Sequence, residues 1–406
     1  MSSEFYRAKL GELINFANGK SSPERIGNAR FAVFGSNGHI GKANEFNSPA
    51  NTIVVGRVGS YCGVVHFSTK ACWVTDNAIK AVAKGDNDPS YLFYLLKHLN
   101  LNNWRSGSGQ PLINQSTLNA IEVRVPGPAI QKTIGSFIGA LDDRITLLRE
   151  TNATLEAIAQ ALFKSWFVDF DPVRAKQEGR APEGMDEATA ALFPDAFEES
   201  ELGLVPRWWM VGTLADLAAL NPEAWTAKNH PDTVAYIDLA NAKDNEIAEI
   251  TDYAFQEAPS RARRVLRHGD TIVGTVRPGN RSFAFIHAAA SNLTGSTGFA
   301  VLRPSKPENT EFIYLAATQD SSIERLAHVA DGGAYPAVRP EVVVGLQCIV
   351  PCKGVMTAFH EVAEPLLAAI SENQRRAQTL ASIRDTLLPR LISGQLRLPE
   401  AEALVA

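Results

Sequence analysis

The chain has 406 residues, an ordinary hydrophobic fraction of 45% and a formal net charge of −5, so it is long enough for two or three domains with cores of their own. No apolar run approaches the roughly 18–20 residues of a membrane span, and residues 1–10 lack the apolar core of a signal peptide, so we expect a cytoplasmic protein with no membrane association. The four cysteines and eight histidines form no set at metal-ligand spacing, so no metal site is expected.

The sequence repeats itself at a fixed spacing of 225 residues. The pair Thr-Leu at 154–155 returns at 379–380, and the pair Val-Pro at 125–126 returns at 350–351. Similarity at a fixed spacing is the signature of an architecture built from repeated units. It predicts two halves of similar fold.

Residues 1–128 are predicted to form a β-rich domain. Short apolar runs such as 52–55 and 63–67 are bounded by Gly, Ser and Asn, as strands commonly are. The segment 91–99 predicts a helix, and the Asn-, Ser- and Gly-rich segment 102–110 predicts a loop. The domain carries 13 Lys and Arg against 8 Asp and Glu, a net charge of +5.

A long helix is predicted over residues 129–168, with its regular part from about 131 to 167. Apolar side chains recur at alternating spacings of four and three, which is the pattern of a coiled-coil seam. At 1.5 Å per residue this helix would be roughly 55 Å long. The seam positions are Ile134, Ile138, Leu141, Ile145, Leu148, Asn152, Leu155, Ala159, Leu162 and Trp166.

Residues 169–210 are predicted to form a connector. Its four prolines and three glycines break any long element, although 186–192 predicts a short helix. The connector holds 4 Lys and Arg against 10 Asp and Glu, a net charge of −6. The charge of the chain is therefore unevenly distributed.

Residues 211–356 are predicted to form a second β-rich domain. Residues 270–276 repeat the strand at 51–56, and residues 332–336 repeat the loop at 107–111.

A second long helix and a C-terminal tail are predicted over 357–406. Pro365 lies inside this segment, so it should kink the helix or delay its start. The seam positions are Phe359, Ala363, Leu366, Ile370, Asn373, Ala377, Leu380, Arg384, Leu387 and Leu391.

Two long helices that each carry one apolar seam are expected to pack on each other. An antiparallel arrangement would bring together residues whose numbers sum to about 525. The expected pairs are Leu148 with Ala377, Asn152 with Asn373, and Leu155 with Ile370. Opposed Asn residues lower the stability of a seam but fix its register. The predicted fold class is α+β, with two β-rich domains joined by two long antiparallel coiled-coil helices in a pseudo-twofold internal repeat.

Motifs of catalysis are incomplete in this sequence. The segment 35–42 is similar to a phosphate-binding loop, but it lacks the first glycine, and Ala43 replaces the Ser or Thr that would follow Lys42. No combination of nucleophile, base and oxyanion donors can be assembled from the motifs. We therefore expect a protein that is not an enzyme.

The chain resembles the specificity subunits of type I restriction–modification systems along essentially its whole length. Each motif is weak alone, but their order along the chain is specific, and the connector is the most distinctive of them. The second copy departs from the first at 277–281, where RPGNR replaces part of the first glycine-rich pattern. The motifs are FGSNG (34–38), GRVGSYCG (56–63), GQP (109–111), WFVDFDPVRAK (166–176) and LPRLISG (388–394).

This resemblance implies a non-catalytic DNA-recognition subunit. It implies target-recognition domains at 1–128 and 211–356, each reading one half of a bipartite double-stranded DNA site, with the helices as spacers. It further implies two methyltransferase subunits and restriction subunits as partners. S-adenosylmethionine, ATP and Mg are expected on those partners, with no cofactor in this chain.

Candidate DNA contacts are long or bidentate polar side chains on predicted loops. Several of them could instead stabilise their own turns, and the arginine-rich run 261–267 could be a solvated face rather than a phosphate contact. The candidates are Ser36, Asn37, His39, Lys42, Arg57, Tyr61, Arg105, Ser108, Gln110, Arg261, Arg263, Arg264, Arg277, Asn280, Arg281, Tyr335 and Arg339.

Two questions stay open from sequence. Phe163, Phe167 and Leu388 could dock methyltransferase subunits, or they could pack under the adjoining domains. The chain could also be a coiled-coil adaptor, or a stand-alone DNA-binding protein without restriction partners.

Overall fold

The computed structural model describes residues 5–106 and 111–403, which form two compact units. Unit 1 is drawn from residues 1–147 and 376–406, and unit 2 consists of residues 148–375. Within the described ranges, no helix is both long and apolar enough to cross a membrane.

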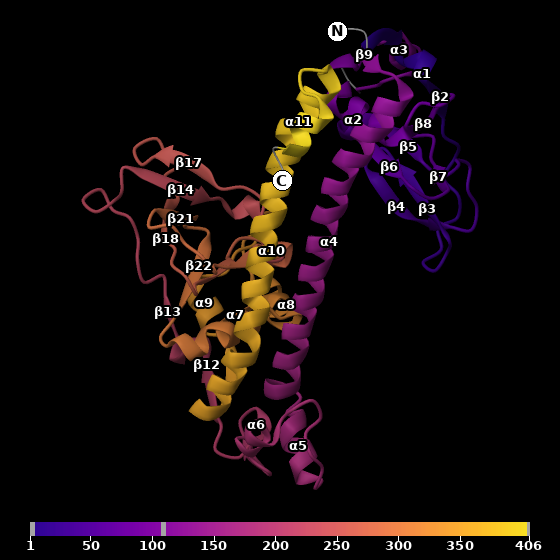
Figure 1. Cartoon of the computed structure of the whole chain (residues 1–406). Coiled ribbons are helices and arrows are strands. Elements are labelled where there is room, and N and C mark those ends of the chain that lie inside the picture. Colours follow the sequence, from indigo (N-terminus) through magenta and orange to yellow (C-terminus); the bar gives the residue numbers. More distant parts are fainter. Residues whose placement is uncertain (1–4, 107–110, 404–406) are drawn as a thin grey trace. The chain divides into compact units, whose positions relative to one another are not determined.

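All described strands of unit 1 lie within the first 126 residues (Figure 1). The strands are β1 (Phe5–Lys9), β2 (Ile14–Asn18), β3 (Phe31–Gly35), β4 (Gly38–Ala43), β5 (Thr52–Gly56), β6 (Val65–Ser68), β7 (Cys72–Val74), β8 (Ala78–Ala83) and β9 (Glu122–Pro126). They form a β1-β9 pair, a sheet in the order β2-β8-β5-β6 and a sheet in the order β4-β3-β7. The short helices are α1 (Leu10–Leu13), η1 (Gly59–Tyr61), α2 (Pro89–His98), η2 (Leu101–Trp104), α3 (Gln115–Ala120) and α11 (Leu398–Ala403).

Unit 2 is built from a larger set of strands. They are β10 (Phe197–Ser200), β11 (Gly203–Pro206), β12 (Met210–Thr213), β13 (Ala218–Leu220), β14 (Thr233–Ile237), β15 (Ala242–Lys243), β16 (Glu246–Ile247), β17 (Thr251–Ala254), β18 (Ala262–Val265), β19 (Thr271–Gly274), β20 (Phe283–Phe285), β21 (Leu293–Ser296), β22 (Phe299–Pro304) and β23 (Gln347–Val350). Its larger sheets have the orders β13-β22-β19-β20 and β17-β14-β21-β18, and β12 pairs with β23.

The short helices of unit 2 lie in the connector and between the strands. They are α5 (Asp171–Gln177), α6 (Glu187–Ala191), η3 (Leu214–Asp216), η4 (Leu239–Asn241), η5 (Pro278–Asn280), η6 (Pro307–Asn309), α7 (Thr310–Thr318), α8 (Asp320–Val329) and α9 (Pro340–Val344). The helices predicted near 91–99 and 186–192 correspond to α2 and α6.

The sequence repeat is a repeat of topology. The order β2-β8-β5-β6 in unit 1 corresponds strand by strand to β13-β22-β19-β20 in unit 2. The second sheet of each unit contains one parallel pair, β3 with β7 and β14 with β21. The pair β1-β9 likewise corresponds to β12-β23. The two β-rich units therefore have the same fold, and unit 2 adds the helix α8 after α7.

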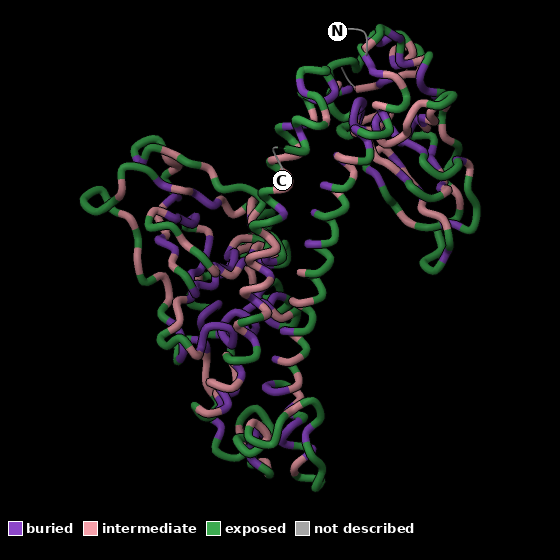
Figure 2. The backbone as a smooth tube through the Cα atoms, in the orientation of Figure 1, coloured by how far each residue is buried: buried purple, intermediate pink, exposed green. Residues whose placement is uncertain are grey.

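Two long helices contribute to both units. They are α4 (Pro128–Phe167) and α10 (Lys353–Ser393). Buried positions recur at intervals along α4, as expected for a seam (Figure 2). The helix α10 begins at Lys353 and continues through Pro365, so the predicted delay of its start is wrong. Pro365 and Glu361 are both exposed, so water can reach the Glu361 carbonyl that loses its helical partner at Pro365.

The helices are antiparallel within unit 2. The Asn373 side chain donates a 2.9 Å hydrogen bond to Oδ1 of Asn152, and the rings of Phe163 and Phe359 lie 6.1 Å apart. Residue numbers therefore fall along α10 as they rise along α4, and the α+β class with antiparallel long helices is confirmed. The predicted pair Leu148–Ala377 falls on different units and stays a prediction.

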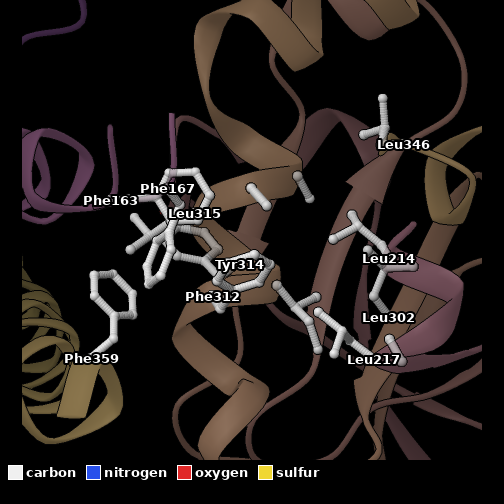
Figure 3. Close-up of a cluster of buried hydrophobic side chains, with 14 of the residues drawn as sticks. Phe163, Phe167, Leu214, Leu217, Leu302, Phe312, Tyr314, Leu315, Leu346 and Phe359 are labelled. Carbon is white, nitrogen blue, oxygen red and sulfur yellow. The ribbon is translucent and has the colours of Figure 1, made fainter. Parts of the chain in front are cut away.

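The core of unit 2 contains the ends of both long helices. Phe163 and Phe167 of α4 face Phe312 of α7 and Phe359 of α10 (Figure 3), and Phe167 lies 5.0 Å from the Phe312 ring and 4.8 Å from the Phe359 ring. Phe163 and Phe167 are 2% and 4% exposed. They are therefore core residues of unit 2 and leave no surface there for a partner, whereas Leu388 is half-buried against the core of unit 1.

Candidate nucleic-acid interface

Two loops pack together beside the β13-β22-β19-β20 sheet of unit 2. The loop 275–281 joins β19 to β20, and the loop 330–338 follows α8. Isolated bridges join Ala337 to both Val276 and Asp331, and the Arg277 amide donates a 2.7 Å hydrogen bond to the Pro336 carbonyl. We call segments 275–281 and 330–338 the paired loops of unit 2.

Unit 1 has the same arrangement in segments 57–63 and 105–113. Leu112 is bridged to both Val58 and Ser106, and the Gly59 amide donates a 3.1 Å hydrogen bond to the Pro111 carbonyl. These segments are the paired loops of unit 1. The predicted contacts Ser108 and Gln110 belong to this region but lie outside the described residues.

The paired loops of unit 2, together with the residue that directly follows them, present four of the predicted DNA contacts to solvent. Tyr335 is 69% exposed, and the Arg277 guanidinium carbon lies 4.5 Å from the centre of its ring. Asn280 and Arg339 are also exposed. Arg339 directly precedes α9 as its N-cap residue. The fold thus brings together side chains from two segments that are 55 or more residues apart in sequence.

Arg281 is in a different environment, although it lies on the same loop. Its guanidinium contacts the Asp244 carboxylate and, at 2.7 Å, the Asp320 carboxylate, and it lies 5.3 Å from the centre of the Phe283 ring. These contacts tie η5 to α8 and to the turn between β15 and β16. Arg281 therefore stabilises the paired loops from inside unit 2.

In unit 1 the predicted contacts lie on two neighbouring features. On the β3-β4 hairpin, Asn37, His39 and Lys42 are exposed, whereas the Ser36 hydroxyl donates to the Asn77 carbonyl. On the paired loops themselves, Tyr61 is 47% exposed. Arg105 is also exposed there, and Arg57 is half-buried.

The arginine-rich run of unit 2 is only partly available to a ligand. Arg261 pairs with Asp238 at 2.8 Å, and the Arg263 guanidinium stacks on Phe255 at 4.7 Å. Arg264 is half-buried, and burial lowers its pKa. The positive charge predicted here is therefore partly compensated inside the unit.

Sequence reasoning missed two exposed rings. His230 stacks on Phe255 with a ring separation of 3.9 Å and an interplanar angle of 4°, on the residue that also carries the Arg263 guanidinium. Trp208, at the end of the connector, is 71% exposed and adopts a φ of +69°. The doubled tryptophan at 208–209 was a usable signal, because two adjacent large rings cannot easily both be buried. Here Trp208 is exposed and Trp209 is buried.

In the part of the chain that the structure describes, no three His, Cys, Asp or Glu side chains group closely enough to hold a metal ion.

The sequence matches a known family over its N-terminal part. Residues 3–157 match the family described as "Type I restriction modification DNA specificity domain".

Two relatives extend the similarity over most of the chain. The MjaIX type I restriction enzyme specificity subunit of Methanocaldococcus jannaschii is 24% identical over 322 residues, which cover 76% of this chain and 69% of the relative. The HindI specificity subunit of Haemophilus influenzae is 27% identical over 337 residues, which cover 72% of each.

A solved structure has a similar fold. The crystal structure of the type I restriction–modification system S subunit from M. genitalium aligns over 96% of both chains with a TM-score of 0.61 and 15% identity. That similarity concerns the fold alone. The family match shows a type I restriction modification DNA specificity domain at residues 3–157, and the two relatives show that most of the chain is similar to type I restriction enzyme specificity subunits.

Proposed function

We propose that the chain recognises a bipartite double-stranded DNA sequence, with each unit contacting one half-site through its paired loops, and that it is not itself catalytic. The observation that carries this proposal is the recurrence of the paired loops. Both units place them at the same point of the same strand order, and the side chains on them differ. A shared scaffold with different loop side chains suits the recognition of two different half-sites.

The long helices suit the role of a spacer. Proteins that read two half-sites from one face of DNA hold their reading elements about one helical turn apart, roughly 34–36 Å, or a multiple of it. The helix α4 has 40 residues and α10 has 41, which corresponds to roughly 60 Å each. Both helices contribute to the cores of both units, so the length of the pair would set the gap between the half-sites.

The partners in this proposal are two methyltransferase subunits and the restriction subunits. S-adenosylmethionine, ATP and Mg would be used by those partners. The two curated relatives are named as specificity subunits of restriction enzymes, which supports an assembly of this kind. The end of the connector offers a surface better suited to protein than to DNA. Trp208 and Met210 are 71% and 68% exposed there. The Trp208 amide donates a 3.2 Å hydrogen bond to the Glu198 carboxylate, and Glu198 and Glu199, both exposed on β10, would repel phosphates.

The decisive measurement is the map of methylated adenines in the genome of the host, compared with a strain that lacks this chain. We expect one motif with two short defined parts and an undefined gap, lost in the deletion strain. A gel-shift with the purified chain, alone and with its partner subunits, tests whether the motif is bound directly. Absence of sequence-specific binding in every combination would reject the proposal and favour a coiled-coil adaptor.

A further inference from the structure

We infer that Arg277 and Tyr335 form one base-reading element of unit 2, and that this element recognises a guanine through paired N–H donors of the Arg277 guanidinium. The inference rests on the proposed DNA-binding function and adds to it the reading residues and the base.

The backbone at Arg277 is the first observation. Arg277 has a φ of +49°, a conformation that glycine adopts easily and side-chain-bearing residues rarely adopt. Its counterpart in unit 1 is Gly59, with a φ of +74°. The correspondence holds because both loops have the same length between paired strands, from Val55 opposite Val65 and from Val273 opposite Phe283.

The backbone conformation of this loop therefore gives no reason for an arginine at this position. Gly59 makes the same backbone hydrogen bond to the opposite loop that Arg277 makes, so the backbone contact does not need a side chain. An unfavourable conformation retained at an exposed residue is commonly a sign of function.

The side chain of Arg277 is held in a defined orientation. Its Nη2 donates a 2.8 Å hydrogen bond to the Ala334 carbonyl, and its guanidinium lies 4.5 Å from the centre of the Tyr335 ring. The loop that carries Tyr335 is itself closed. The Tyr335 amide donates to the Gly332 carbonyl at 3.2 Å, and the Gly332 amide donates to the Asp331 carboxylate at 2.8 Å.

The charge of Arg277 is also uncompensated. Within residues 148–375, all of which are described, no carboxylate lies within ion-pair distance of Arg277. Arg261 is paired with Asp238, and Arg281 is paired with Asp244 and Asp320. Among these three arginines, only Arg277 has its positive charge free for a ligand.

The chemistry of this arrangement selects a base. A guanidinium has five N–H donors, and the contact with Ala334 uses one of them. The remaining coplanar donors match the O6 and N7 acceptors of guanine in the major groove. Adenine presents an N6 donor beside N7, so it cannot accept the same pair of hydrogen bonds. Gly59 has no side chain, so unit 1 lacks this element and the guanine belongs to the half-site of unit 2.

The test uses the assembled methyltransferase complex and a DNA library in which each position of both half-sites carries all four bases. With Arg277→Gly we expect one G·C position in one half-site to lose its discrimination by roughly 5- to 150-fold, the range for one bidentate base contact. Arg277→Lys should lose the same discrimination while keeping the charge, because an ammonium group cannot offer two coplanar donors. Tyr335→Phe should keep the discrimination at this position because the ring remains, and Tyr335→Ala should weaken the discrimination.

The variants also distinguish a loss of base recognition from a loss of stability. Glycine relieves the positive φ, so Arg277→Gly should unfold at the same temperature as the wild type or a higher one. Arg325→Ala, which removes an exposed arginine of α8, is the matched control for charge and should leave all base preferences unchanged.

Two kinds of result would overturn the inference. If Arg277→Gly weakened binding to all sequences equally and Arg277→Lys restored it, Arg277 would contact phosphate rather than a base. A wild-type motif without a G·C pair in either half-site would also exclude the assignment. By contrast, a wild-type complex without any sequence preference would reject the proposed function itself.

Discussion

At the scale of single residues, each unit fixes a helix to α4 through the same kind of contact. The Tyr94 hydroxyl on α2 donates to Asp142 at 2.7 Å, and the Tyr314 hydroxyl on α7 donates to Glu156 at 2.8 Å. Tyr94 and Tyr314 are 4% and 0% exposed, and a phenol at such depth needs a hydrogen-bond partner. Asp142 is also paired with Arg384 of α10 at 2.5 Å, whereas Glu156 accepts only neutral donors, from Tyr314 and from Asn245 at 3.2 Å.

The stability of unit 2 should therefore depend on the protonation of Glu156. Burial raises the pKa of Glu156 above its ordinary value of 4.5, so the folded state binds this proton more tightly than the unfolded state. The stabilising effect is present at low pH and is lost as the pH rises from about 4.5 through the raised pKa, by about 1.4 kcal/mol per pH unit within that window.

In Glu156→Gln this pH dependence should disappear, and the free energy of unfolding should be higher than that of the wild type above the window. Denaturant unfolding of both proteins between pH 4.5 and 8 measures how the free energy of unfolding depends on pH. The control is Glu150→Gln, at an exposed position of the same helix. Identical pH profiles for the wild type and Glu156→Gln would contradict the assignment.

Sequence reasoning at this scale identified side chains but not their partners. Arg277, Arg281 and Tyr335 were all predicted from the chemistry of their loops. Arg277 and Tyr335 form a stacked pair without a carboxylate partner among the described residues, whereas Arg281 forms partly exposed ion pairs with Asp244 and Asp320, which are 37 and 39 residues from it. Contacts over such distances arise from packing, and no local pattern encodes them.

At the scale of elements, the two long helices are joined by a polar pair within unit 2. Asn373 donates to Asn152 at 2.9 Å, and Asn152 in turn donates to the Ile370 carbonyl at 3.1 Å. Asn152 and Asn373 are half-buried. A polar pair among apolar seam residues lowers stability but disfavours shifted registers.

Asn152→Leu alone should destabilise the protein by about 1–3 kcal/mol, because it leaves the Asn373 amide and the Ile370 carbonyl without their partner. The double variant Asn152→Leu/Asn373→Leu should recover most of that loss. A double-mutant cycle from denaturant unfolding gives the coupling directly. Additive effects of the two single variants would show that the pair is not energetically coupled.

The long helices were predictable because their spacing of four and three repeats over many turns. The sequence does not predict α5, because the prolines of the connector, Pro172 among them, indicate breaks in long elements. Proline is compatible with the first turn of a helix, where its absent N–H would have no partner, and Pro172 occupies that turn of α5. Pro365, by contrast, lies in the interior of α10, where proline removes a helical hydrogen bond. The helix tolerates it there on an exposed face.

At the scale of the whole molecule, two units of one topology carry different loops. The similarity of strand order in the two units was foreseeable from the 225-residue spacing. The paired loops were not, because their two segments meet only after the sheets form. Since α4 and α10 both contribute to each unit, the proposed recognition of two half-sites makes helix length a determinant of the DNA gap.

Insertion of seven residues into both α4 and α10 keeps each seam in register and lengthens the pair by roughly 10 Å. We expect the undefined gap of the recognised sequence to widen by about three base pairs, at roughly 3.4 Å per base pair. The methylated motif of a strain that carries the insertion measures this. The control is an insertion of the same length in the turn at 179–184, which should leave the gap unchanged. An unchanged gap in the helix variant would reject the spacer role.

The division of the chain also sets an order of events on the ribosome. Unit 2 is one continuous segment, 148–375, whereas unit 1 needs residues 376–406. Domains commonly fold as they leave the ribosome. Unit 2 can therefore complete its core before residues 376–406, which unit 1 needs, have been synthesised. Until Leu387 and Leu391 emerge, Ile134 and Ile138 lack apolar neighbours with which they share a core. The half of the protein that is translated first is therefore the half that is completed last, because part of its core is supplied by the last helices to be synthesised.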